Sequence, residues 1–103
     1  MIEKNISEGV VTLVVKGNIV ASMAKSLKEE MLPLLKEEFN EFTIDLDEVS
    51  SIDSSGVGVL IAAQNDLKKK NAQLTVINVS EPILKMFRIM RLDRHFNVHG
   101  KKD

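Results

Sequence analysis

The sequence predicts one α/β domain with a mixed four- to five-stranded sheet, in which an N-terminal antiparallel hairpin is followed by parallel strands that alternate with helices. Three observations predict it. Runs of β-branched residues alternate with segments whose apolar residues repeat every three or four positions. Only a short turn separates the first two runs. No repeat, linker or low-complexity stretch interrupts the 103 residues, so residues 1–103 are expected to form a single domain.

The opening hairpin is predicted from two runs. Val10 to Val15 is a β-branched strand, which the turn-like residues 7–9 precede and Lys16-Gly17 ends. A short strand over residues 2–6 is its expected partner. Because so few residues join them, the two strands must be antiparallel.

The first helix is predicted from Ser22, a plausible N-cap, to about Glu38. Pro33 lies inside the pattern, and we expect a bend or restart there, before Leu34. The methionines are interpreted either as core residues or as an adaptable contact surface. The apolar positions that define the helix are Met23, Leu27, Met31 and Leu34, and Met86 further along the chain raises the same question.

The middle of the chain predicts a strand over residues 42–46, an acidic loop over 47–51 and a second helix that begins near Asp53 or Ser54. The helix ends in three lysines, which suit the negative end of its dipole. Its expected inward face consists of Val57, Leu60, Ile61 and Gln64.

The C-terminal part predicts a strand over residues 74–79, so continuously apolar that we expect cover on both faces. Ser80 as N-cap and Pro82 in the first turn open a third helix. A last short strand is expected around Phe96 and Val98, before a polar tail over about 99–103. The expected core stripe of the third helix is Ile83, Leu84, Phe87 and Met90.

Composition excludes several classes of function. With 14 Lys and Arg against 15 Asp and Glu and only four aromatic residues, all Phe, nucleic acid is not an expected partner. The lack of Cys excludes disulfides and thiol chemistry and fits a reducing compartment, so we expect a cytoplasmic location. No signal peptide or run of about 20 apolar residues occurs, and membrane insertion is not expected.

The segment Asp53-Ser54-Ser55-Gly56-Val57-Gly58 is the candidate site. Serines at a helix start lie beside free backbone N–H groups, where a phosphate would be stabilised. Each glycine costs about 1 kcal/mol of helix propensity relative to Ala, which either tight packing or close approach of a partner would explain. The simpler interpretations are that Ser54 is an ordinary N-cap and that Asp53 is a turn or capping carboxylate.

Enzymatic chemistry is not expected. The candidate segment lacks the glycine of a nucleophile elbow and the third glycine of a dinucleotide fingerprint, and His95 and His99 lie far along the chain. A hard cation held by Asp45, Asp47 and Asp53 is a minor alternative, because their spacing is not typical of a site. A receiver domain would need an acidic pair after its first strand, which this chain lacks. No catalytic residue, metal or cofactor is predicted.

Residues 53–60, preceded by the acidic strand end at residues 44–49, resemble the signature of the STAS family, which includes bacterial anti-sigma factor antagonists and related sulphate-transporter domains. The resemblance covers almost the whole chain. It implies a phosphorylation switch: an anti-sigma factor that is also a serine kinase would phosphorylate Ser54, and a serine phosphatase would reset it. The resemblance and the helix start together make Asp53, Ser55, Gly56, Gly58 and Asn18 the expected partner-binding residues.

One segment departs from the family pattern. The antagonists usually carry Gly-Glu-hydrophobic-Asp after the second strand, whereas this chain has Gly17-Asn18-Ile19-Val20. The loss of both carboxylates favours an alternative function, in which an unmodified STAS domain serves as a scaffold or subunit of a transporter or signalling assembly. Simple divergence of the loop would also explain it.

Overall fold

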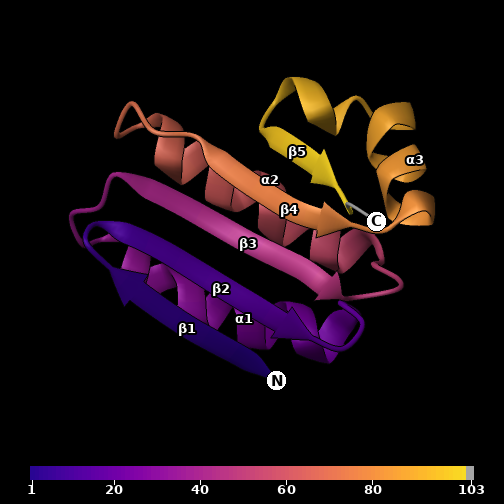
Figure 1. Ribbon diagram of the computed structural model, residues 1–103, viewed down its shortest axis with the longest axis horizontal. Helices are drawn as coiled ribbons and strands as arrows, with labels where there is room; N and C mark the ends of the chain where they lie inside the picture. Colours follow the sequence, from indigo (N-terminus) through magenta and orange to yellow (C-terminus); the bar gives the residue numbers. More distant parts are fainter. Residues whose placement is uncertain (102–103) are drawn as a thin grey trace.

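Five strands form one mixed sheet in a computed structural model of the chain, which describes residues 1–101. The strands lie in sequence order; β1 and β2 are antiparallel and every other neighbouring pair is parallel (Figure 1). The predicted fold class is confirmed. The elements are β1 Ile2–Ser7, β2 Val10–Lys16, α1 Ala21–Leu35, β3 Glu41–Glu48, α2 Ser54–Lys68, β4 Leu74–Val79, α3 Glu81–Ile89, the 3₁₀ helix η1 Leu92–Arg94, and β5 Asn97–Gly100.

The β1–β2 hairpin closes through a two-residue turn. Glu8 and Gly9 both have positive φ, at 50° and 81°, as the hairpin turn that matches the strand twist requires. A side chain on Gly9 would also collide with Asn40, since an added Cβ would lie 2.6 Å from its Nδ2. The turn therefore sets the register, in which Ile2 pairs with Val15 and Ser7 with Val10.

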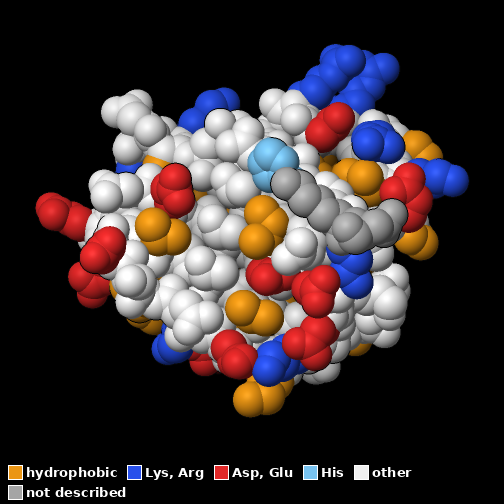
Figure 2. Space-filling view, in the orientation of Figure 1, with side chains coloured by type: hydrophobic (Ala, Val, Ile, Leu, Met, Phe, Trp, Pro, Cys, Tyr) orange, Lys and Arg blue, Asp and Glu red, His pale blue; other side chains and the backbone are white. Residues whose placement is uncertain are grey.

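Helices α1 and α2 cover one face of the sheet, α3 follows the end of β4, and η1 lies between α3 and the start of β5 (Figure 1). The burial of β2 alternates accordingly, with Val11, Leu13 and Val15 buried and the residues between them half-buried. Figure 2 shows the other face of the sheet, which is open to solvent. The prediction that residues 74–79 are covered on both faces is therefore wrong, because Thr75 and Ile77 point to this open face and stay half-buried.

Aromatic packing anchors α3. The rings of Phe87 and Phe96 meet edge to face with centroids 6.0 Å apart, and both residues are fully buried. This contact joins α3 to the segment that leads into β5, which pairs with β4.

The first helix differs from the prediction at both ends. It begins at Ala21 with Val20 in the N-cap position and no capping side chain, so Ser22 is not the N-cap. Pro33 lies in the last turn, and the helix neither breaks before it nor restarts after it, but ends two residues later at Leu35. Pro33 lacks the N–H that would donate to the Glu29 carbonyl oxygen, and only two helical residues follow it, so the helix ends soon after the proline. The helix is shorter than the predicted span to Glu38.

Three further predictions are wrong at surface positions. Ile61 and Met90 were expected in the core but are 38% and 47% exposed. Met90 follows the last residue of α3 and so leaves its inward face. His99 and Gly100 belong to β5, so the predicted tail begins too early, and residues 102–103 lie outside the described residues.

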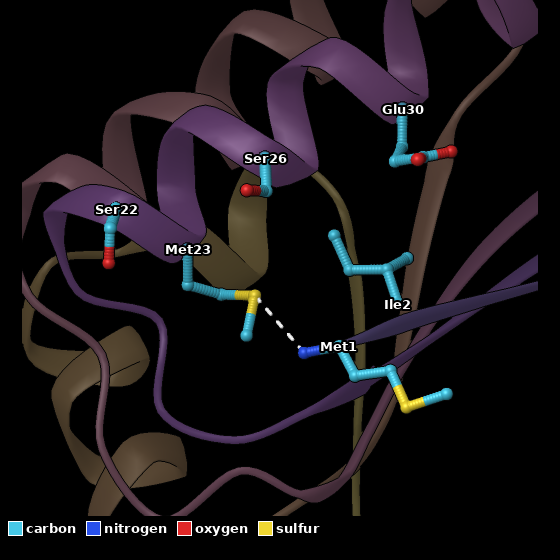
Figure 3. A pocket seen from close by; sticks show the side chains of 6 residues that line it. All are labelled: Met1, Ile2, Ser22, Met23, Ser26 and Glu30. Atoms are coloured by element: carbon cyan, nitrogen blue, oxygen red, sulfur yellow. Dashed lines mark hydrogen bonds between the residues drawn. The ribbon is translucent and has the colours of Figure 1, made fainter.

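The amino group of Met1 points toward α1, while the residue as a whole is 72% exposed (Figure 3). Its amino group donates to the Lys16 carbonyl oxygen at 3.1 Å and points to the Met23 sulfur at 3.8 Å. A shallow hollow of about 340 Å³ lies beside it. Met31 is buried and Met23 is partly buried against the core, so both methionines of α1 serve packing.

We expect Phe87→Ala to lower the free energy of unfolding by about 3 kcal/mol or more, because it leaves a cavity and removes the ring contact with Phe96. Urea denaturation measures this. Ile89→Ala on the same helix is the control: Ile89 is 82% exposed, and its loss should change stability by less than about 0.5 kcal/mol. Equal losses for the two variants would contradict the packing described for α3.

Candidate functional site at the start of helix α2

Asp53 caps helix α2. Its Oδ1 accepts a hydrogen bond from the backbone N–H of Gly56 at 3.1 Å, and its backbone is extended, as an N-cap residue requires. Ser54 is therefore the first residue inside the helix, and the interpretation of Ser54 as an ordinary N-cap is wrong. Because the Asp53 carboxylate supplies the cap, the Ser54 hydroxyl is not needed for that role.

Both serines of the segment are exposed. Ser54 and Ser55 occupy the first two helical positions, beside backbone N–H groups that have no acceptor one turn earlier. The positive end of the helix dipole acts on the same two positions. A negative group attached to either hydroxyl would reach solvent directly and would feel a favourable local field.

A neighbouring loop fixes the position of this helix start. Ile19, between β2 and α1, forms an isolated parallel bridge with Ile52. The Ile19 N–H donates to the Ser51 carbonyl oxygen, and the Asp53 N–H donates to the Ile19 carbonyl oxygen, both at 3.1 Å. The capping residue is thus tied to the adjacent loop through its own backbone.

Asn18 adds a side-chain clamp to the same pair of loops. Its Oδ1 accepts from the Ser50 N–H at 3.1 Å, the Ser50 hydroxyl at 2.9 Å and the Ser51 N–H at 3.1 Å. Three donors around one amide oxygen hold residues 50 and 51 in place. The structure therefore brings Asn18 to the loop that precedes Asp53.

The two glycines of the segment have different surroundings. Gly56 is buried, and an added Cβ would lie 2.5 Å from Ile52 Cγ1 and 2.6 Å from Ile19 Cγ2. Gly58 is exposed and would meet nothing within 4 Å. Packing inside the domain accounts for Gly56, whereas no contact within residues 1–101 requires a glycine at position 58.

Sequence reasoning missed the contributions of Ser50, Ser51, Ile19 and Ile52. No local pattern marks them, because each acts through a residue more than 30 positions away. The parallel pairing of β2 with β3 was the available signal: the loops after neighbouring parallel strands emerge at one edge of the sheet and meet there.

Two of the three acidic residues weighed as cation ligands, Asp45 and Asp53, have other roles. Asp45 Oδ1 accepts from the Asp47 N–H at 2.9 Å and from Asn78 Nδ2 at 3.0 Å, while Asp53 caps α2. Within residues 1–101 no group of three or more His, Asp or Glu side chains is arranged to hold a metal ion. None of the helices in that range has the length and apolar character needed to cross a membrane.

Comparison with known proteins assigns the family. The model of the STAS domain matches residues 1–103. An anti-sigma-B factor antagonist of Bacillus subtilis is 30% identical over 89 residues, which are 86% of this chain and 81% of that protein. The fold and this match together define the class of protein: the chain belongs to the STAS domain family.

Solved structures share the fold. A crystal structure of an anti-sigma factor antagonist from Mycobacterium paratuberculosis superposes with a TM-score of 0.85 at 21% identity, over 96% of this chain and 84% of that one. The phosphorylated form of the Bacillus cell fate determinant SpoIIAA gives 0.76 at 15% identity, over 95% and 90%. At these identities the likeness establishes the architecture alone.

We expect Gly56→Ala to lower the free energy of unfolding by about 1–3 kcal/mol, because the new methyl group must displace Ile52 and Ile19. Gly58→Ala is the matched control. It adds the same methyl group to the same helix in open space and should raise stability by about 0.5–1 kcal/mol through helix propensity. Chemical denaturation of both variants measures the difference, and stabilisation by Gly56→Ala would refute the packing argument.

We expect Asn18→Ala to lower the free energy of unfolding by about 1–2 kcal/mol, because the donors of Ser50 and Ser51 lose their common acceptor. Asn18→Asp keeps an oxygen acceptor at the same place and should retain most of that stability. Hydrogen exchange at the Ser50 and Ser51 amides reports the clamp directly. Exchange that is unchanged in Asn18→Ala would show that the clamp does not hold the loop in solution.

Proposed function

We propose that this protein is an anti-sigma factor antagonist that is phosphorylated on Ser54 by an anti-sigma factor with serine kinase activity. One observation carries the proposal: Ser54 is exposed at the first position of α2, directly after a carboxylate that already caps the helix. The name of the Bacillus subtilis relative and the phosphorylated state of the solved SpoIIAA structure support it. A serine phosphatase would restore the free hydroxyl.

The proposed partner surface surrounds this serine. Asp53, Ser54, Ser55 and Gly58 are all exposed on the first turns of α2. Because Gly58 carries no side chain and has free space around it, a partner's backbone can approach the helix closely there. We assign Gly56 and Asn18 an indirect role in binding, which is to hold the helix start in its place.

Charge explains how one phosphate would switch this surface. Phosphorylation adds about −1.5 to −2 charges at pH 7, next to the Asp53 carboxylate. The helix dipole offsets part of that charge within the free domain. A partner that packs closely on the helix must instead desolvate the phosphate, which costs several kcal/mol unless cations meet it. Phosphorylation thus weakens the complex while the fold stays intact.

We expect incubation with the cognate kinase and ATP to place one phosphate on Ser54, as mapped by mass spectrometry. Ser54→Ala should abolish the modification, whereas Ser55→Ala, the neighbouring hydroxyl in a similar exposed position, should retain it. Binding of the kinase, measured by calorimetry, should weaken at least tenfold in Ser54→Asp. A phosphate found elsewhere, or none, would overturn the proposal.

A second function is favoured by the loop at residues 17–20. Val20 is an apolar residue, 45% exposed, in the N-cap position of α1, where the family's antagonists usually carry a carboxylate. This residue favours a constitutive STAS scaffold that binds a transporter or signalling assembly without modification. If Ser54→Ala and Ser54→Asp bind the natural partner equally well, the scaffold is the correct function.

A further inference from the structure

The small net charge conceals a strong separation of charge along the chain. Residues 1–66 contain 12 of the 15 Asp and Glu residues but only five of the 14 Lys and Arg residues. The other nine cations follow in residues 67–103, with only three acids. Figure 2 shows several blue side chains over α3 and η1 with red ones among them, and further blue side chains elsewhere on this face. The end of the molecule formed by α3 and η1 is basic, because it carries Lys85, Arg88, Arg91 and Arg94 against Glu81 and Asp93.

A groove of about 670 Å³ opens at this basic end, between the second half of α2, the loop after it and η1. Lys68, Arg94 and His95 line it and are exposed. Two exposed apolar residues, Ile61 and Met90, line it as well. Its volume lies within the range of small-molecule sites, and its walls combine cations with apolar side chains.

Gln64 supplies a fixed donor to this groove. The residue is only 7% exposed, and its Oε1 accepts from the Leu74 N–H at 2.8 Å. That bond fixes the orientation of the amide, so Nε2 is the side-chain atom that remains available as a hydrogen-bond donor. Within residues 1–101 Nε2 makes no hydrogen bond, and it is not sealed from solvent. This donor opens into the groove, where either water or the acceptor atom of a ligand can pair with it.

We propose that this groove binds a small organic carboxylate. The carboxylate would accept hydrogen bonds from Gln64 Nε2, Arg94 and Lys68, and the apolar body of the ligand would rest on Ile61 and Met90. Each of these side chains lines the same groove. Arg94 suits a carboxylate because its planar guanidinium can donate two parallel hydrogen bonds. The site is separate from the proposed phosphorylation site, since Ser54 and Lys68 stand at opposite ends of α2, about 20 Å apart at 1.5 Å per residue.

The test is an NMR titration of the isotope-labelled full chain with octanoate, with octanol as the neutral control. Octanoate should shift the Gln64 side-chain amide and the backbone amides near Met90 and Arg94, saturating with a dissociation constant of about 1 mM or lower. Octanol should bind at least tenfold more weakly, because it cannot satisfy the cations. No kinase or ATP is present, so the result is independent of the proposed switch.

Variants distinguish a specific carboxylate-binding site from the nonspecific attraction of an anion to a basic surface. Arg94→Gln should weaken octanoate binding about tenfold. Arg88→Gln removes the same charge from an exposed position on α3 outside the groove and should leave binding within about twofold. Gln64→Glu keeps an acceptor for the Leu74 N–H, removes the free donor and should weaken binding by a similar factor to Arg94→Gln.

Three results would overturn the proposal. The first is the absence of saturable shifts in the groove with octanoate or benzoate at about 10 mM, a concentration well above the expected dissociation constant. The second is equal weakening by Arg94→Gln and Arg88→Gln, which would reduce the effect to general charge. The third is binding of an acidic peptide at the groove when octanoate does not bind, which would make the groove a protein-docking surface instead.

Discussion

The contact between the loops that follow β2 and β3 determines the geometry of the candidate site. Ile19 and Ile52 continue the parallel pairing of the two strands beyond the sheet, and Ile19 exchanges backbone hydrogen bonds with both sides of Ile52. Helix α2 begins at Ser54, two residues after Ile52, and packs on the side chains of Ile19 and Ile52, which leave no room for a side chain at position 56. The exposure of Ser54 is therefore set by backbone contacts that its own side chain does not make.

The strands were the most predictable part of the fold, because their signals are local. The bounds of β2 and β4 agree to within one residue with those predicted from the β-branched run at Val10 and the apolar run at Leu74. The errors concern packing between elements. A run of apolar residues does not reveal that helices cover only one face of the sheet, which is why β4 was expected to be buried on both faces. Met90 fits the helical period, but the helix ends before it.

The candidate site was predictable where a single segment defines it and unpredictable where two segments meet. The helix start near Asp53 followed from local sequence, but Asp and Ser are both good N-caps, and only the course of the backbone decides between Asp53 and Ser54. Gly56 and Gly58 are equivalent in sequence, since both lie in the first turns of one helix. Their difference depends on which side of α2 faces Ile19. The clamp at Asn18 joins residues 32 positions apart and has no local signature.

The separation of acidic and basic residues gives the domain an electric dipole moment far larger than its net charge of −1 suggests. In solution such a molecule does not meet a charged partner in random orientation, because the partner's field turns it during the last nanometre of approach. A partner with a positive surface is drawn toward the carboxylates of β3, while an anion is drawn toward α3 and η1. The electric field therefore orients each kind of partner before any side chain makes contact. Added salt screens this field without altering the fold.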